Sequence, residues 1–527
     1  MLSLRTVSSA CLIMVALAWH LPHADAKKKR TRFLVYEEAA KPQHASPAER
    51  SIREAIDGWG QTQRRLLGYD PRLGRVSQRL LRRHGVQERA TMSEVRRIAN
   101  QHGVTDGQLA FITAYAPTIE NLAQQVRGEL APILTDRAMS HFGLSVRPRK
   151  DGFDTLIVFS KRLIDLQPIR ARVPKGRNIS ISGELRMTEQ DPAPKVITLS
   201  LTRPGGKVEQ RELPLTDGIF KTWFPAGRTP GVVQVQLSVE HGLGPEVAAL
   251  FPIGVKLSPW KRTPEVDIPN KTLEPEPALS TLLLKARRDR GLNLPAQSSL
   301  LAQIARAHAQ DMLDHHFFAH VSATTGDLTD RLAHHRIRFV KAFENIAAGS
   351  SVENLLEQWL DSPSHRANLF APNLTAFGVG VVSAPELPAA PLYAVLVLIT
   401  QEDTAEAKTL AELAYQRANA ARVSLGLEGL ERDPALDAIA LRHSREIASG
   451  GQVTDHNPLR GYLSDTVFDE TGAWETAVDV YRTRTVDVVM HASNLRDREF
   501  ERLGVGIYRR SQKLGEPLWI TVVYANH

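Results

Sequence analysis

The sequence predicts an α+β protein in which modules that run from helices to strands accompany a small β-sandwich. Two observations support this fold class. Residues 278–402 show helical apolar periodicity followed by strand-like runs, whereas residues 163–258 alternate with period two. The chain also contains an internal repeat, because HRANLFAPNLTAFGVGV and HASNLRDREFERLGVGI align without a gap from their histidine to their closing GVG.

Residues 1–26 predict a cleaved signal peptide. Arg5 precedes the apolar run ACLIMVALAW, and small residues stand at Ala24 and Ala26, the two positions that a signal peptidase reads. The run is too short to span a bilayer, and no later segment approaches eighteen uninterrupted apolar residues. We therefore expect a secreted or periplasmic protein without a transmembrane segment.

The cysteine content and the charge exclude several classes of function. Cys11 is the single cysteine and lies inside the apolar run, so the mature chain is expected to have no disulfide, thiolate nucleophile or cysteine-based zinc site. The net charge of +8 is a mild excess for 527 residues, and no basic stripe with interleaved aromatic residues accompanies it. Nucleic acid is therefore not an expected partner. The basic run at residues 27–32 is interpreted as a solvated tail, with adhesion to an anionic envelope polymer as the alternative.

Residues 46–162 are expected to be a degenerate copy of the later modules. The sequence DPRL at residues 70–73 resembles DPAL at residues 433–436. Leu130 stands thirteen residues before Gly143, where the repeat would require a histidine. This copy is therefore predicted to have lost the site and to serve a structural role.

Residues 163–258 predict a small antiparallel β-sandwich. Alternating runs such as VITLSLT and VVQVQLSV are separated by turns that contain Pro and Gly. No catalytic cluster occurs in this segment, so a spacer or adhesive role is expected. The prolines of residues 259–277 predict a semi-rigid linker.

Residues 278–402 and 405–527 are expected to be two modules with the same order of elements. An early helix in each has an apolar stripe that includes a histidine, His308 in the first and His443 in the second. We interpret these two histidines as core residues rather than ligands. Each module then closes with a GVG strand and a second, strongly apolar strand.

The candidate site of the first module consists of His320, Glu344 and His365. Two histidines and a carboxylate on separate elements can converge only if the fold brings them together. The second module has a weaker set, namely His456, Glu470 and His491.

In the weaker set, His491 and Glu470 are matched to the first module by different observations. His491 is aligned by the shared segment HxxNL, whereas Glu470 is placed only by lying 21 residues before His491, as Glu344 lies before His365. The following apolar stripe begins four residues after Glu470 but eight after Glu344. Two compensating length changes would produce the same spacing.

The segments HAQDMLDHHFFAHVS, FENIAAG and QWLDSPSHRANLFAPNLTAFGVGVV resemble the bacterial branch of the CAP superfamily, which includes cysteine-rich secretory proteins, antigen 5 and plant pathogenesis-related proteins. The resemblance is specific over residues 278–402 and weaker over residues 405–527. It implies an α-β-α sandwich with a central antiparallel sheet, and a cleft lined by two histidines and acidic residues. Matched by position, His320, Glu344 and His365 would line that cleft.

Two positions depart from the family pattern. Phe343 replaces the usual glycine before the glutamate, which is expected to narrow the cleft. The second acidic residue of eukaryotic members falls at Ser362, and the neighbouring Asp361 is adjacent without being equivalent. Asp361 is kept as a candidate cleft residue, but a complete site of four residues is not expected.

Three roles for this set remain open from the sequence. Neutral imidazoles suit Zn²⁺, so His320 and His365 are the candidate metal ligands, and three protein ligands with an open position are typical of catalytic zinc. Glu344 and a histidine could instead act on a bound water as general acid and base, since no motif specifies a serine or cysteine nucleophile. The third role is a hydrogen-bonded polar cluster that holds the loops over the cleft.

Two functions of the whole protein follow from these roles. The leading hypothesis is a non-catalytic extracellular or periplasmic binding protein for a lipid-like or envelope-derived ligand, because the resemblance implies sterol or lipid binding and extracellular partners. The expected partner is then a small apolar ligand or a cell-envelope component. The alternative is a metal-dependent hydrolase that acts on peptide or cell-wall material through the His/Glu/His site. Zinc is the cofactor that the second hypothesis requires.

We predict that export removes residues 1–26, so that the mature protein begins at Lys27. N-terminal sequencing of the exported material should therefore read Lys-Lys-Lys-Arg. An intact Met1 on the exported protein would contradict this cleavage.

Overall fold

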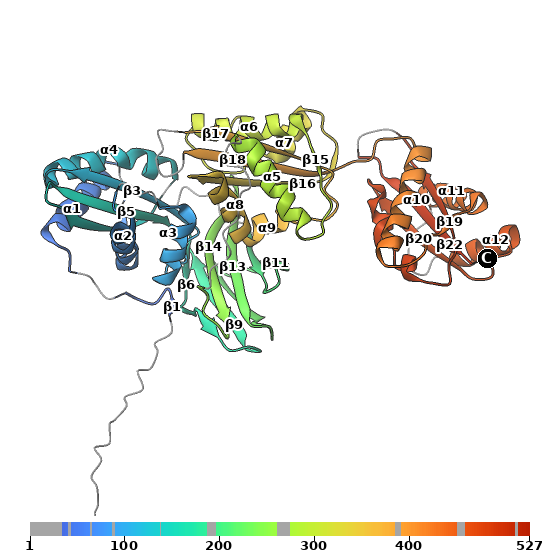
Figure 1. The fold of residues 1–527 in the computed structure, drawn as a ribbon, viewed down its shortest axis with the longest axis horizontal. Helices are drawn as coiled ribbons and strands as arrows, with labels where there is room; N and C mark the ends of the chain where they lie inside the picture. The colour runs from blue at the N-terminus through green and yellow to red at the C-terminus, as the bar shows by residue number, and fades with distance from the viewer. Residues whose placement is uncertain are drawn as a thin grey trace, which may run out of the picture. The chain divides into compact units, whose positions relative to one another are not determined.

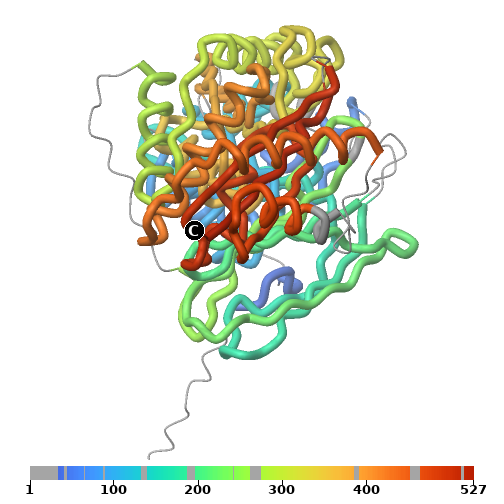
Figure 2. Tube along the Cα trace, turned by 90° about the vertical axis from the view of Figure 1, so that its right-hand side faces the viewer, coloured from blue at the N-terminus to red at the C-terminus, as the bar shows by residue number. Residues whose placement is uncertain are grey.

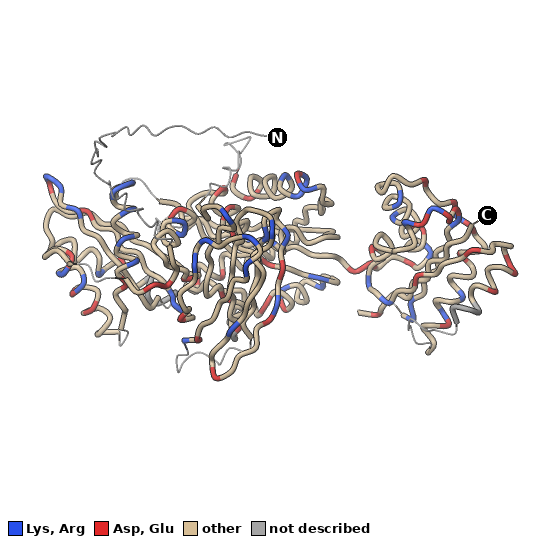
Figure 3. The backbone as a smooth tube through the Cα atoms, turned by 90° about the horizontal axis from the view of Figure 1, so that it is seen from below, with Lys and Arg blue, Asp and Glu red and all other residues tan. Residues whose placement is uncertain are grey.

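The computed structural model describes residues 34–40, 44–63, 66–86, 90–137, 139–186, 196–260, 274–384, 391–450, 459–511 and 515–526. The predicted signal peptide, most of the predicted linker and His456 lie outside these ranges. Helices and mainly antiparallel sheets alternate along the described chain, which confirms the α+β class (Figure 1). A two-residue edge strand in each four-stranded sheet pairs in parallel with its neighbour. Figure 3 shows acidic and basic residues interspersed along the backbone, as the small net charge implies. None of the helices in the described part of the chain combines the length and apolarity that crossing a bilayer requires.

The N-terminal module is a four-stranded sheet between two helical layers (Figure 1). Its helices are α1 (Pro47–Thr62), α2 (Pro71–His84), α3 (Met92–Gln101) and α4 (Ile119–Arg137). Its strands, in sheet order, are β2 (Gly68–Tyr69), β4 (His141–Pro148), β5 (Phe153–Lys161) and β3 (Gln108–Ala116). Alternate residues of the central strands face opposite layers, Ile157 toward α1 and α4 and Val158 toward α2 and α3.

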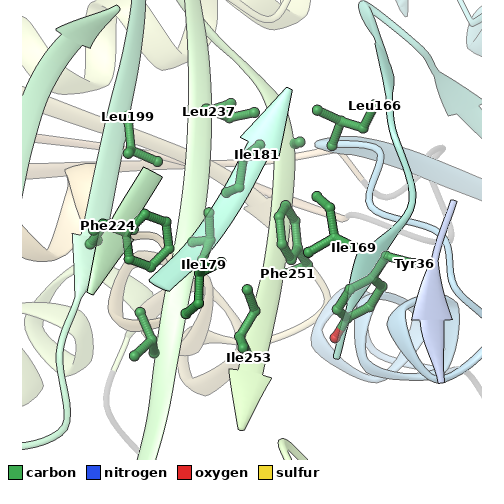
Figure 4. Close-up of a cluster of buried hydrophobic side chains, with 14 of the residues drawn as sticks. Tyr36, Leu166, Ile169, Ile179, Ile181, Leu199, Phe224, Leu237, Phe251 and Ile253 are labelled. Carbon is green, nitrogen blue, oxygen red and sulfur yellow. The ribbon is translucent and has the colours of Figure 1, made fainter. Parts of the chain in front are cut away.

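The sandwich consists of two sheets whose apolar faces meet. One sheet contains β11 (Val208–Leu213), β10 (Val196–Thr202), β13 (Gly231–His241), β14 (Gly244–Val255) and β8 (Arg172–Val173). The other contains β12 (Ile219–Pro225), β9 (Asn178–Leu185) and β6 (Ile164–Leu166). Figure 4 shows Leu237 and Phe251 of the first sheet opposite Ile181 of the second.

A short N-terminal strand joins the sandwich core, which the sequence did not indicate. β1 (Val35–Tyr36) pairs with β7 (Ile169–Arg170). The Tyr36 side chain is fully buried in the sandwich core, and its hydroxyl donates to the carbonyl of Pro252 at 2.6 Å.

The central module repeats the α-β-α arrangement. Its helices are α5 (Pro275–Arg288), α6 (Ser299–Asp314), α7 (Leu328–His334), α8 (Val352–Asp361) and α9 (Pro363–Leu369). Its strands, in sheet order, are β15 (Ala296–Gln297), β17 (Ala376–Ser383), β18 (Leu392–Gln401) and β16 (Phe339–Gly349). One face packs on α6 and the other on α5 and α8. Helix α5 begins at Pro275, inside the segment expected to be linker.

The C-terminal module, drawn in orange and red in Figure 2, has the same order of elements and strands. Its helices are α10 (Ala407–Ser424), α11 (Pro434–Ala448), α12 (Leu459–Thr471) and the 3₁₀ turns η1 (Val486–His491) and η2 (Ser493–Arg496). Its strands, in sheet order, are β19 (Glu431–Arg432), β21 (Arg502–Tyr508), β22 (Leu518–Ala525) and β20 (Thr476–Thr483). The three four-stranded sheets therefore share one strand order, which favours the interpretation of residues 46–162 as a degenerate copy.

The repeated glycines are required because the closing strand lies directly on a helix backbone. A Cβ atom on Gly378 would collide with the α6 backbone at Ala302, and one on Gly380 would collide at Arg306. The same holds for the glycines of β21 against α11 and for Gly143 of β4 against α2. The glycines of the GVG repeat are therefore needed because a helix backbone lies directly against the strand, and not because they form a turn.

A buried arginine repeats in the two later modules. Arg287 of α5 donates through Nη1 to the carbonyls of Leu369 and Ala371, at 2.7 and 3.0 Å. Arg422 of α10 donates in the same way to Leu495 at 3.0 Å. Both arginines satisfy carbonyls at the end of the segment that begins with the aligned histidine. Burial lowers the pKa of Arg287 to about 10, so it remains charged at neutral pH.

We expect Gly380→Ala to destabilise the protein by at least about 2 kcal/mol, because the added methyl group must push β17 away from α6. Gly58→Ala is the matched control, since Gly58 lies inside α1 with no atom within 4 Å of an added Cβ. That change should instead stabilise by about 0.5–1 kcal/mol. Scanning calorimetry of the full exported chain measures both effects, and equal transition temperatures would refute the close-approach argument.

Candidate functional site

The three predicted residues of the central module lie on three separate elements that meet at the edge strand β16. His320 lies in the loop between α6 and α7, Glu344 in β16 and His365 in the first turn of α9. His320 Nδ1 and Glu344 Oε1 are 2.9 Å apart. The structure therefore brings His320 and Glu344 into contact, and it places His365 on helix α9, which is hydrogen-bonded to β16 through Asn345.

The Glu344 carboxylate has a partner on each oxygen. Oε1 bonds to His320, and Oε2 accepts a hydrogen bond from Arg331 Nη2 at 2.6 Å. The side chains of Glu344 and Arg331 are only 4% and 5% exposed. Burial alone would raise the pKa of Glu344, but the hydrogen bond from His320 and the charges of His320 and Arg331 bring it below its usual value. Glu344 is therefore ionised at neutral pH.

This arrangement fixes the orientation of the His320 ring. Because Nδ1 faces a carboxylate, it carries a proton, and Nε2 points away from Glu344. Arg331 also donates to the carbonyls of Gly326 (2.7 Å) and His320 (3.3 Å), so it holds the loop as well as the carboxylate. The sequence analysis missed Arg331, because no spacing rule connects it to Glu344 thirteen residues later.

His308 lies behind this pair. Its side chain is fully buried, as the sequence predicted for a core histidine, and its Nε2 is 3.1 Å from the carbonyl of Ala319 and 3.8 Å from Glu344 Oε1. Burial lowers its pKa, so this imidazole is neutral. His308 thus adds a polar contact between α6 and the site.

His365 is held through the backbone of α9. Its amide donates to Ser362 Oγ at 3.3 Å, which caps the helix, and its carbonyl accepts from Asn345 Nδ2 at 3.0 Å. Asn345 follows Glu344 in β16, so the two side chains point to opposite faces of the sheet. Burial, together with the charge of His320, lowers the pKa of the half-buried His365 to about 3. Its imidazole is therefore neutral at physiological pH.

Asp361 does not join this group. It is the exposed last residue of α8, and its charge interacts with Glu357, Arg96 and Arg366 rather than with the two histidines.

The weaker set of the C-terminal module is not assembled in the same way. Glu470 lies in the last turn of α12, is 41% exposed and pairs with Arg442 at 2.7 Å. His491 is exposed at the end of η1, with Nε2 3.0 Å from Asn373 Nδ2 of the central module. His456 lies outside the described residues.

The strand register identifies the residue that corresponds to Glu344. In the central module Gly378 pairs with Val397, which pairs with Glu344. In the C-terminal module the same path leads from Gly504 through Val523 to Val478. Val478 therefore replaces Glu470 in the alignment, and the equal spacing of 21 residues results from compensating length changes. The N-terminal module has Phe111 at this position.

A separate hollow of about 380 Å³ contains none of these side chains. It is lined by Val340, Arg482, Thr483, Arg484, Gly515 and Pro517.

Of the three predicted side chains, only the two histidines remain as candidate metal ligands. Within the described ranges, no group of three or more His, Cys, Asp or Glu side chains is arranged to hold a metal ion. Glu344 already accepts hydrogen bonds on both oxygens, so the remaining donors are His320 Nε2 and the imidazole of His365. A Zn²⁺ ion bound there would need its other ligands from water or from a bound molecule.

The central and C-terminal modules match a known protein family. Residues 282–398 and 415–524 fit the model of the cysteine-rich secretory protein family, CAP.

Two relatives from Bacillus subtilis cover shorter stretches. The chain is 37% identical over 99 residues to the uncharacterized protein YkwD, which is 19% of this chain and 38% of that protein. It is 40% identical over 82 residues to the uncharacterized membrane protein YlbC, which is 15% of this chain and 23% of that protein. The chain thus spans well under half the length of these relatives.

Solved structures with some similarity include an extracellular protein containing an SCP domain from Bacillus anthracis, at 21% identity and a TM-score of 0.22, covering 42% of this chain and 78% of that one. An outer surface protein from Borrelia burgdorferi is 18% identical with a TM-score of 0.23, covering 25% of this chain and 97% of that one.

The low pKa of His365 predicts that the free energy of unfolding decreases as the pH is lowered. An unfolded histidine titrates near ~6.5, so between that pH and about 3 the unfolded chain binds a proton that the folded chain does not. The free energy of unfolding should therefore fall on acidification by at most about 1.4 kcal/mol per pH unit from this residue. His365→Gln should remove that part of the slope in denaturant titrations without metal. An identical pH slope in the variant would show that the folded His365 is protonated like a free histidine.

Proposed function

This chain is a CAP superfamily protein with tandem modules, and from that premise we propose that it is a secreted, non-catalytic binding protein. Its central module would take a lipid-like or envelope-derived ligand at His320 and His365. Export is supported by the predicted signal peptide at residues 1–26.

The observation that supports a non-catalytic role is that both carboxylate oxygens of Glu344 already have hydrogen-bond partners. A general base needs a carboxylate oxygen within hydrogen-bond reach of the proton that it removes. Both Glu344 oxygens are engaged, by His320 and Arg331, and the side chain is almost completely buried. The Glu344 carboxylate is thus better suited to orient the His320 imidazole than to activate a water molecule.

The surroundings of His320 support an apolar ligand. Phe317 and Phe318 precede it, pack against the module core and remain partly accessible. Leu243 of the sandwich lies beside the same loop, and 53% of its surface is exposed. Apolar side chains with a few convergent polar groups are typical of small-molecule sites. The outward Nε2 of His320 and the neutral His365 would bond to the polar end of such a ligand.

The runner-up is the metal-dependent hydrolase. His320 and His365 would hold Zn²⁺, which supplies a Lewis acid and a more acidic bound water. The chain itself would contribute the orientation of His320 through Glu344 and Arg331, and a neutral His365 that is ready to coordinate without losing a proton.

We expect the exported protein to bind cis-parinaric acid, a fluorescent fatty acid, with a His320→Ala/His365→Ala variant at least about tenfold weaker because two polar contacts are lost. His491→Ala is the matched control, since His491 is exposed in the other module and should leave binding unchanged. Fluorescence titration measures affinity, and circular dichroism verifies that each variant is folded.

Two outcomes would overturn this proposal. One is parinarate binding that the double variant retains in full. The other is zinc-dependent release of dye from labelled peptidoglycan that Glu344→Gln abolishes, which would establish the hydrolase instead. Zinc calorimetry on the same variants separates a metal-binding role of His320 and His365 from ligand binding without metal.

A further inference from the structure

The hairpin formed by β13 and β14 of the sandwich reaches the loop that carries His320. The amide of Val321 donates to the carbonyl of Leu243 at the hairpin tip, at 3.2 Å. A Cβ atom placed on Gly244 would lie 3.1 Å from His320 Cβ and 3.6 Å from Val321 Cγ2. The tip is therefore in van der Waals contact with the first histidine of the site.

The first strand of this hairpin, β13, contacts the helix that carries His365. Gln236 of β13 is 0% exposed, and its Oε1 accepts from Ser362 Oγ at 2.7 Å. Its Nε2 donates to Ser364 Oγ at 2.7 Å and to Ser238 Oγ at 2.8 Å. Ser362 is the residue that caps α9 at the His365 amide. The β13–β14 hairpin thus touches the elements of both site histidines.

The burial of Gln236 is informative because of its place in the strand. Val235 and Leu237 face the sandwich core, so Gln236 and Ser238 point outward, where an independent sandwich would expose them to water. They are buried because α9 lies against β10, β11 and β13. Every polar group of the Gln236 amide is satisfied there, as buried polar groups in native interfaces are.

The N-terminal module holds the other side of the hairpin. The amide of Gly107 donates to Ala248 at 2.9 Å, and the amide of Leu250 donates to Thr105 at 2.8 Å. Lys161 Nζ pairs with Glu246 Oε1 at 2.7 Å, with both side chains largely buried. Residues near the hairpin tip are therefore fixed to the N-terminal module while the tip itself lies at His320.

We propose that the β13–β14 tip, Leu243 and Gly244, is a wall of the His320 site that limits access to its imidazole and positions its loop. Any ligand that approaches His320 from this side must contact Leu243, so the sandwich contributes to the specificity of the central module. The N-terminal module, which has Phe111 at the register position of Glu344, serves as the support of this wall. This inference rests on the proposed function only for the statement that a ligand binds there.

The test compares two glycines with nearly equal backbone angles. Gly244 has φ +93° and Gly205 has φ +94°, but nothing lies within 4 Å of a Cβ on Gly205. Gly244→Ala and Gly205→Ala should therefore cost similar backbone strain, while only the first pushes against His320. Diethyl pyrocarbonate is the probe, and mass spectrometry of the His320 peptide gives its rate of modification in the full chain.

We expect His320 to react at least about threefold faster in Gly244→Ala than in the wild-type protein, because the tip is displaced. Gly205→Ala should react at the wild-type rate. Gln236→Ala, which removes the bonds to Ser362 and Ser364, should also accelerate the reaction and keeps the test decisive if Gly244→Ala does not fold.

Unchanged reactivity of His320 in folded Gly244→Ala or Gln236→Ala would overturn the proposal, and so would equal acceleration in Gly205→Ala. The reagent acts on the imidazole directly and needs neither fatty acid nor metal. A failure to bind parinarate would thus contradict only the proposed ligand-binding function. An unchanged modification rate of His320 would contradict only the proposal that the hairpin tip is a wall of the site.

Discussion

The close contact between the closing glycines and a helix backbone is the constraint on which each module depends. Gly378 allows α6 to lie directly on β17, and the register places Val397 and Glu344 in the same row on the same face. The helix that this contact admits brings His308 to 3.8 Å from Glu344. Two consecutive residues of the edge strand β16 therefore act on opposite faces of the sheet. Glu344 orients His320 on one face, and Asn345 holds α9 on the other.

Local patterns predicted the parts of the fold that depend on neighbouring residues. Helical stripes, period-two strands and the GVG repeat indicated the modules and the sandwich, and the family resemblance indicated that His320, Glu344 and His365 converge. Partners that meet only in three dimensions were beyond these patterns. Arg331 has no motif. Alternation alone would place Gln236 in water, although Ser362, 126 residues away, hydrogen-bonds to it. Glu470 was aligned with Glu344 by counting residues, and insertions or deletions change that count. The pairing of strands does not depend on the count, and it places Val478 at the position of Glu344.

The sandwich also makes contacts that the spacer or adhesive role expected from its sequence does not require. A spacer needs only a soluble outer surface, whereas this one has a buried polar face that bonds to α9 and a hairpin tip at His320. Its polar outer face would be costly to bury without partners, and the partners are present. The site of the central module is therefore built with contributions from outside that module.

The C-terminal module provides an internal control for the meaning of the Glu344 cluster. It keeps the glycine contact, the buried arginine and an Asn494–Asp479 bond that corresponds to Asn368–Asn345, and it forms the same sheet. Yet Val478 occupies the position of the glutamate, so this architecture does not require a buried carboxylate there. A buried ion pair is often no more stabilising than apolar residues of similar volume. The cluster of Glu344, Arg331 and His320 is thus better explained by the binding role proposed for the central module than by a need to stabilise its fold.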